Sequence, residues 1–398
     1  MRFSNLLLLL SVFLIIFSFW PLVFYNLVTD DFFLLWISKF DSLGEFLSFF
    51  TFSHSFSAEF AFYRPLTIQV YYSLINHFFG LDPTAYHIAS LGLHIINTLL
   101  VYKLANIFLA SRSFSVIAAL LFGLNPSQTM AIGWAANFQE VGVTFFIILA
   151  TLTFHTSLRK RGWKFFSLFM YLSSITFFTL ALASKQGAMI FPFVLIVMIL
   201  LFGRRKDLLK TIPFFIILLF YTYFHFVKYH FEQTESYTFI LDSQVFNTLR
   251  WHIWWALGFP EPFTTFIGPK LRVLNQLWIS FFKEGIIVFS LFIIINLALV
   301  LEIFAIIRKK FVEIFDRRIL FFSLFYFLFL ASIFQQKHFQ QSLCKSSLFS
   351  RGFQRLLFCS LLLFLSVLFF FLQNKTHQFL FLHLIYLLLY CNIPQSIF

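Results

Sequence analysis

Long apolar runs alternate with short polar connections along most of the chain. Many of these runs approach 20 residues, the length that an α-helix needs to cross about 30 Å of hydrocarbon. Helices are expected at residues 6–28, 84–109, 114–124, 139–154, 165–182, 191–204 and 212–227, with further apolar runs beyond them. The pattern predicts an all-α polytopic membrane protein with about nine to eleven transmembrane helices.

The composition agrees with this prediction. Hydrophobic residues make up 60% of the 398 residues and charged residues only 11%, whereas soluble domains carry about 25% charged residues. The net charge of +13 would suggest a nucleic-acid partner in a soluble protein. Here the basic residues cluster in the short connections, so we interpret them as topology signals and expect no nucleic-acid partner.

Basic clusters fall on every second connection, which predicts the orientation of the chain. Arg2 precedes the first run, and further clusters lie at Arg112, at 159–164, at 204–206, at 308–310 and at 317–318. Positive charge is retained in the cytoplasm, so the N-terminus is expected there. No A-x-A-like cleavage site follows the first run, and it therefore reads as a retained signal anchor. Residues 29–83 become the first external loop, and two apolar stretches in that loop predict helices lying along the membrane interface.

The distribution of charged residues and cysteines changes after Asp316. No acidic residue follows it, although residues 335–355 should be external and carry four basic residues, and all three cysteines lie in this part at Cys344, Cys359 and Cys391. We expect a transmembrane domain at residues 1–334. Residues 335–398 form either a divergent helical hairpin or a degenerate or frame-shifted end.

Two adjacent acids, Asp30 and Asp31, follow the first apolar run. Acids are scarce, with 16 in the whole chain, and this pair stands where the backbone leaves the membrane. The pair is either a solvated helix end or a catalytic site. A carboxylate partly shielded by aromatic residues can serve as a general base, a role worth roughly 10²–10⁴ in rate.

A polar stripe follows on the second predicted span. Its members His87, Ser90, His94 and Asn97 are spaced to share one face of a helix. Polar groups are costly in hydrocarbon, so this face is expected to point into the bundle or into a wet cavity. Interhelical hydrogen bonding explains the stripe equally well.

Two isolated cations, Arg64 and Lys185, are also predicted to be external. They either bind lipid headgroups or neutralise a lipid phosphate in an active site. The chain has no Walker-type phosphate loop and no H-E-x-x-H motif, so an activated donor is expected to come from the membrane itself.

Several motifs occur in the order typical of one family. They are Asp30-Asp31, Tyr63-Arg64-Pro65-Leu66, Tyr86-His87, the segment 93–102 that begins Leu-His-Ile-Ile-Asn, the segment 118–126 that ends Leu-Asn-Pro, Trp134, and Ser184-Lys185-Gln186 ahead of Pro192. In these features residues 1–205 resemble the GT-C superfamily of polytopic glycosyltransferases, which includes protein O-mannosyltransferases and aminoarabinose transferases. The closest resemblance is to the group with tetratricopeptide tails.

The resemblance implies a GT-C-type bundle that transfers a sugar from a polyprenyl-phosphate donor to an acceptor hydroxyl of a protein, lipid or glycan on the external, periplasmic or lumenal side. It implies that Asp30 or Asp31 is the base of an inverting displacement and that Arg64 and Lys185 bind the donor phosphate. The resemblance also assigns the cavity lining to His87, His94, Asn97 and Glu140. Some members use a divalent metal and others do not, so the resemblance does not decide whether this chain binds one. Asp30 and Asp31 would be the candidate ligands.

The chain departs from the family at two positions. Gln139-Glu140 stand where the family commonly has a basic residue, and Gln186 replaces a usual Glu. Two alternatives to a glycosyltransferase therefore remain. One is a transporter or flippase that uses the histidines and acids as a coupling path, and the other is an inactive, truncated paralogue.

Overall fold

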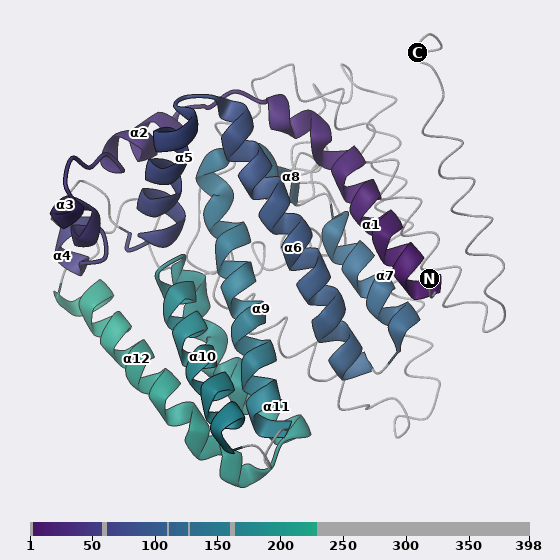
Figure 1. The fold of residues 1–398 in the computed structure, drawn as a ribbon. Coiled ribbons are helices and arrows are strands. Elements are labelled where there is room, and N and C mark those ends of the chain that lie inside the picture. The colour runs from purple at the N-terminus through teal and green to yellow at the C-terminus, as the bar shows by residue number, and fades with distance from the viewer. Residues whose placement is uncertain (1–2, 58–61, 110, 126–127, 160–163, 229–398) are drawn as a thin grey trace, which may run out of the picture. The chain divides into compact units, whose positions relative to one another are not determined.

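The computed structural model of the protein describes residues 3–57, 62–109, 111–125, 128–159 and 164–228. Within these residues the chain forms helices and helical turns and no strand (Figure 1). The predicted eighth and ninth spans and the segment 335–398 lie outside the described residues.

Five described segments are long and apolar enough to cross a membrane, which confirms an all-α polytopic membrane protein. The helices in these segments are α1 (Phe3–Phe19) with the turn η1 (Trp20–Phe24), α6 (Pro83–Leu109), α9 (Phe138–Arg159), α10 (Lys164–Leu182) and α12 (Ile212–Thr222). The helices α6, α9 and α10 match the predicted spans closely, because long apolar runs bounded by charged or turn residues leave little choice of secondary structure.

Two shorter apolar helices also belong to the described part of the bundle. The helix α7 (Arg112–Gly123) packs against α6 and α1, and α11 (Phe191–Phe202) follows the turn η4 (Gln186–Ile190). At 12 residues α7 is too short to span the hydrocarbon alone. It leads to the short elements α8 (Gln128–Gly133) and η3 (Ala135–Asn137) before α9 begins.

Helices that are consecutive in the sequence pack together in some places, and helices further apart in the sequence pack together in others. α9 packs along α10 on one side and α6 on the other, and α6 packs along α7 (Figure 1). Between α10, α11 and α12 the fully buried rings of Phe178, Phe191 and Phe214 have centroids 5.5–5.9 Å apart. This aromatic core fixes the part of the bundle that follows α9.

One end of the bundle carries a cap of short helices formed by residues 30–79 (Figure 1). Its elements are α2 (Asp30–Ile37), α3 (Leu43–Ser48), α4 (Phe52–Ser57), the turn η2 (Leu66–Val70) and α5 (Tyr71–Phe79). A second apolar cluster, which includes Leu34, Ile68 and Tyr72, joins α2, η2 and α5. The helices expected near both ends of the first loop are therefore confirmed, and α3 and α4 are additional.

The up-and-down order of the helices separates two sets of charges. The end that carries the cap also carries Asp30, Arg64, Glu140 and Lys185. The connections at the other end carry Arg112, Arg159 and Lys164, and the turn η5 (Arg205–Thr211) (Figure 1). All candidate charged residues of the site therefore share one end of the bundle.

Candidate functional site

Asp31 is enclosed at the start of α2, with 0% of its surface exposed. Its Oδ1 accepts hydrogen bonds from the Tyr72 hydroxyl at 2.7 Å and the Ala136 amide at 2.8 Å, and Oδ2 accepts from the Val28 amide at 2.8 Å. One carboxylate thus ties the end of the first span to α5 and to the turn before α9. These three hydrogen bonds compensate the burial of the Asp31 carboxylate and fix its position.

The protonation of Asp31 reflects competing effects. Burial raises its pKa, while the three hydrogen bonds and the neighbouring His87 oppose that rise. The charge of Asp31 and burial together raise the pKa of Tyr72 well above its ordinary value. Tyr72 therefore acts as a hydrogen-bond donor to the carboxylate.

Asp30 lies next to Asp31 but has a different environment. It is exposed, and its carboxylate makes no hydrogen bond or ion pair with any described residue. Although the residue is exposed, the surrounding protein removes part of the water around its carboxyl group, and this desolvation raises the pKa of Asp30. The preceding Thr29 has a φ of 32°, an uncommon value for a β-branched residue, and such strained backbone clusters at functional sites. Of the two acids, Asp30 is the one available to a ligand.

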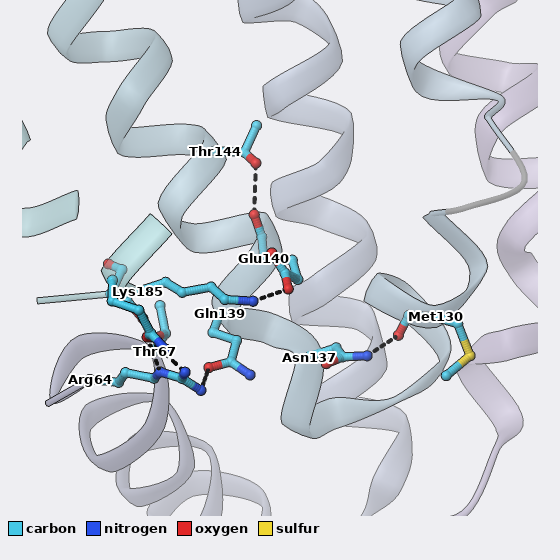
Figure 2. A network of polar contacts seen from close by, with 10 residues as sticks. Arg64, Thr67, Met130, Asn137, Gln139, Glu140, Thr144 and Lys185 are labelled. Carbon is cyan, nitrogen blue, oxygen red and sulfur yellow. Dashed lines mark hydrogen bonds and ion pairs between the residues drawn. The ribbon is translucent and has the colours of Figure 1, made fainter. Parts of the chain in front are cut away.

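Arg64 lies in the cap with only 5% of its surface exposed. Its Nε and Nη2 donate to Oε1 of Gln186 at 2.9 and 2.7 Å, and its Nη1 donates to Oε1 of Gln139 (Figure 2). The guanidinium also lies 4.2 Å from the ring centre of Phe62. These two amide oxygens fix the orientation of the guanidinium.

Lys185 lies beside Arg64 and forms an ion pair with Glu140 at the start of α9 (Figure 2). The side chain of Lys185 is 12% exposed and that of Glu140 is 46% exposed. Burial lowers the pKa of Lys185, as does the nearby Arg64, while Glu140 opposes this effect. The cation is therefore kept charged chiefly by one half-exposed carboxylate.

Backbone contacts bring these distant residues together. The Leu66 amide donates to the Ala183 carbonyl at 3.2 Å, and the Thr67 hydroxyl donates to the Ser184 carbonyl at 2.6 Å. Gly142 allows α9 to approach the same turn, because a Cβ there would lie 2.5 Å from Cγ2 of Thr67. The turn η2, the Lys185 loop and the start of α9 thus form one packed unit.

The polar stripe on α6 is buried between helices. His87 Nδ1 donates to the carbonyl of Ile132 at 3.0 Å, His94 Nε2 to that of Gly123 at 3.0 Å, and Asn97 Nδ2 to that of Val141 at 2.8 Å. The interhelical hydrogen bonding considered from the sequence is therefore present. A cavity-lining role for His87, His94, Asn97 and Glu140 stays a prediction.

The structure brings Arg64, Lys185 and Glu140 into one charged cluster and places both aspartates at the same end of the bundle (Figures 1 and 2). Residues 136–140 link the two regions, since the Ala136 amide binds Asp31 while Gln139 and Glu140 bind the two cations. Sequence reasoning missed Tyr72 and the roles of Gln139 and Gln186. In the sequence, the positions of Gln139 and Gln186 at the ends of apolar runs could have pointed to their roles.

No group of three His, Cys, Asp or Glu side chains suited to hold a metal ion occurs in the described part of the chain. Both oxygens of Asp31 already accept hydrogen bonds. The Asp30 carboxylate accepts no hydrogen bond from any described residue, so Asp30 stays the candidate metal ligand of the adjacent pair.

Comparison with curated proteins finds several similar enzymes. The protein O-mannosyl-transferase tmtc2 of Xenopus laevis is 32% identical over 103 residues, which are 26% of this chain and 12% of that protein. The protein O-mannosyl-transferase TMTC3 of Homo sapiens is 31% identical over 96 residues, or 24% of this chain and 10% of that protein. The Drosophila melanogaster protein O-mannosyl-transferase Tmtc1 is 29% identical over 84 residues, which are 21% of this chain and 10% of that protein.

These relatives are all protein O-mannosyl-transferases. The resemblance predicted from the ordered motifs is confirmed as a similarity over part of the chain, which aligns with about a tenth of the length of the relatives. No family model matches the chain. No solved structure matches it either.

Proposed function

We propose that the protein is a membrane glycosyltransferase that moves a mannosyl or related sugar from a polyprenyl-phosphate donor to an acceptor hydroxyl. The observation that carries the proposal is the Arg64–Lys185–Glu140 cluster at the same end of the bundle as Asp30. The similarity to protein O-mannosyl-transferases favours a sugar as the transferred group and a protein as the acceptor.

The charged cluster suits a lipid phosphate. Arg64 and Lys185 each carry one positive charge and Glu140 carries one negative charge, so these three side chains together have a formal charge of plus one. Guanidinium and ammonium groups are the usual protein ligands of phosphate. Fixed cations stabilise the charge that develops on a leaving phosphate, and they do so best where water is excluded.

Asp30 is the base in this proposal. Its carboxylate removes the proton from the acceptor hydroxyl as the hydroxyl oxygen attacks the anomeric carbon of the sugar. The bond from that carbon to the phosphate oxygen breaks, the electron pair stays with the polyprenyl phosphate, and the sugar inverts. Arg64 and Lys185 bind the departing phosphate, while Asp31 positions α2 and with it Asp30.

The proposed orientation follows from the charges at the two ends of the bundle. The end with Arg112, Arg159 and η5 is cytoplasmic, since positive charge is retained there, and the N-terminus of α1 is at that end. The candidate site then faces the external, periplasmic or lumenal side. The donor reaches it through the membrane lipids, which suits an enzyme whose described part contains no nucleotide-binding fold.

A reconstituted transfer assay tests the proposal. Purified full-length protein in liposomes is given polyprenyl-phosphate mannose with a labelled sugar, together with serine- and threonine-containing peptides. We expect label in the peptide with wild-type protein and a loss of at least about tenfold with Arg64→Gln, because a charge-assisted contact to the phosphate is removed. Lys103→Gln is the matched control, since Lys103 is exposed on α6 near its cytoplasmic end.

The outcomes separate the alternatives. Label that crosses the membrane still attached to the lipid would indicate a flippase instead of a transferase. Absence of both transfer and lipid movement, with correctly folded protein, would favour an inactive copy. Either result contradicts the proposed activity.

A further inference from the structure

Tyr221 near the end of α12 is a buried polar residue whose hydroxyl lacks a partner among the described residues. Only 3% of the residue is exposed, and its hydroxyl makes no hydrogen bond there. A buried hydroxyl that lacks a partner costs about 1–3 kcal/mol, and native proteins pair nearly all such groups. The burial of the Tyr221 hydroxyl without a partner therefore needs an explanation.

Tyr221 lies beside the Arg64 site. Its ring centre is 6.2 Å from that of Tyr63, the residue before Arg64, and 5.8 Å from that of Phe52 on α4. The positive charge of Arg64 acts on the Tyr221 hydroxyl and also on His225, whose ring stacks on Tyr221 at 5.3 Å. The hydroxyl thus belongs to the electrostatic neighbourhood of the guanidinium.

The surroundings of this hydroxyl are aromatic. Phe52 stacks on Tyr63 with ring centres 4.1 Å apart, and Phe224 lies 5.2 Å from Phe52. Aromatic walls exclude water, and hydrogen bonds to charged groups are stronger in such an environment. A hydrogen bond from a nearby hydroxyl to an anion bound at Arg64 would therefore be stronger here than in water.

The opposite face of α12 is apolar and exposed. Ile216, Leu219 and Phe220 are 60%, 68% and 59% exposed, although they belong to a segment long and apolar enough to cross a membrane. These side chains are therefore expected to contact hydrocarbon. Tyr221 thus joins an apolar, lipid-facing helix to the cationic cluster.

We propose that the Tyr221 hydroxyl is a further ligand-binding group of the Arg64–Lys185 site and donates a hydrogen bond to the phosphate of a lipid-linked ligand. The inference rests on the proposed function and extends the site to a third segment of the chain. Arg64 contributes from the cap, Lys185 from the loop after α10, and Tyr221 from α12. Phosphate has enough acceptor oxygens for all three donors.

The test is a binding measurement with a pair of probes that differ only in the phosphate. Full-length protein in phosphatidylcholine nanodiscs is titrated with farnesyl phosphate, farnesol and inorganic phosphate. Wild-type protein is expected to prefer farnesyl phosphate over both other probes. Tyr221→Phe keeps the ring and its stacking, and we expect it to weaken farnesyl phosphate binding about tenfold, or about 1.4 kcal/mol, while leaving farnesol binding unchanged.

Two further variants make the result interpretable. Tyr223→Phe removes an equivalent hydroxyl from a 52% exposed residue two positions along the chain and is expected to have no effect on binding. Arg64→Gln tests the phosphate site itself and is expected to remove the preference for farnesyl phosphate over farnesol. Thermal stability of Tyr221→Phe should be unchanged or higher, because the variant removes an unsatisfied buried group.

Each other outcome overturns the inference. Wild-type affinity in Tyr221→Phe, with the expected loss in Arg64→Gln, would refute the role of Tyr221 and leave the proposed function standing. Equal weakening of farnesyl phosphate and farnesol would assign Tyr221 to the lipid tail. No preference of the wild-type protein for farnesyl phosphate over farnesol would refute the phosphate site and the inference together. Equal affinity for inorganic phosphate would show that the site does not require a lipid-linked ligand.

Discussion

The Asp31 region and the Arg64–Lys185 region both bury charge at one end of the same bundle, but they satisfy it differently. Asp31 accepts three hydrogen bonds from neutral donors on three different segments. Arg64 donates to two glutamine oxygens, and Lys185 pairs with a half-exposed carboxylate. The Asp31 carboxylate is held by neutral hydrogen-bond donors, whereas the second region brings two cationic side chains close together, and the proposed function assigns those cations to an anionic ligand.

This difference separates a structural role from a binding role. A buried carboxylate with its hydrogen bonds satisfied stabilises the arrangement of its neighbours, and removing it leaves several donors without partners. If the Arg64–Lys185 cluster binds an anion as proposed, its variants should change ligand binding more than stability. Mutations in the two regions should therefore affect different measurements.

The largest expected effect is on stability and comes from Asp31→Ala. The variant leaves the Tyr72 hydroxyl and two amides without their acceptor, and at about 1–3 kcal/mol each this amounts to roughly 3 kcal/mol or more. Thermal unfolding of the purified protein in detergent measures it. Asp30→Ala is the control, since it loses only a favourable charge at a helix start, worth roughly 0.3–1 kcal/mol. Equal midpoints for the two variants would refute the structural role of Asp31.

The next effect is on binding and comes from Lys185→Gln. The variant removes one of the two cations and lowers the formal charge of the cluster from plus one to zero. We expect farnesyl phosphate binding to fall roughly tenfold to a hundredfold, the size of one lost charge-assisted contact, with little change in thermal stability. A large drop in stability with unchanged affinity would place Lys185 with Asp31 as a structural residue.

A smaller effect is expected from Gln186→Glu. The new carboxylate would accept hydrogen bonds from Nε and Nη2 of Arg64 and cancel the excess charge of the cluster. We expect about tenfold weaker farnesyl phosphate binding with equal or higher stability.

The double variant Gln186→Glu with Glu140→Gln is the matched control, because it restores the formal charge. Its affinity should return toward that of the wild-type protein. If the double variant binds as weakly as the single one, the charge of the cluster does not control binding.

The sequence predicted the long helices better than the site. Apolar runs defined α6, α9 and α10 closely, but α7 is shorter than a span and the cap contains α3 and α4 as well as the two expected helices. Short helices in an aromatic-rich loop carry no clear periodicity, so their boundaries depend on tertiary packing.

The candidate residues could be selected from the sequence because they are charged residues in an apolar chain. Their roles depend on contacts between distant segments, which local sequence patterns do not reveal. Arg64 and Lys185 meet because the Leu66 amide donates to the Ala183 carbonyl and the Thr67 hydroxyl to the Ser184 carbonyl, and these contacts join segments that lie far apart in the sequence. Asp30 and Asp31 look equivalent in sequence. Adjacent side chains on a helix point about 100° apart, so one aspartate faces inward to Tyr72 and the other is exposed.

In the proposed mechanism Asp30 is the base, Asp31 positions it, and Arg64 and Lys185 bind the donor phosphate. This mechanism predicts a specific pH dependence, because a base acts when it is ionised. Desolvation raises the pKa of Asp30, so sugar transfer should fall as the pH drops through this raised pKa, at a higher pH than for an ordinary aspartate.

The most direct test is the rate of sugar transfer by Asp30→Asn at saturating polyprenyl-phosphate mannose. We predict a rate roughly 10²–10⁴ lower than that of the wild-type protein, without the acid-side decline and with donor affinity and thermal stability retained. A wild-type rate in Asp30→Asn would contradict the account.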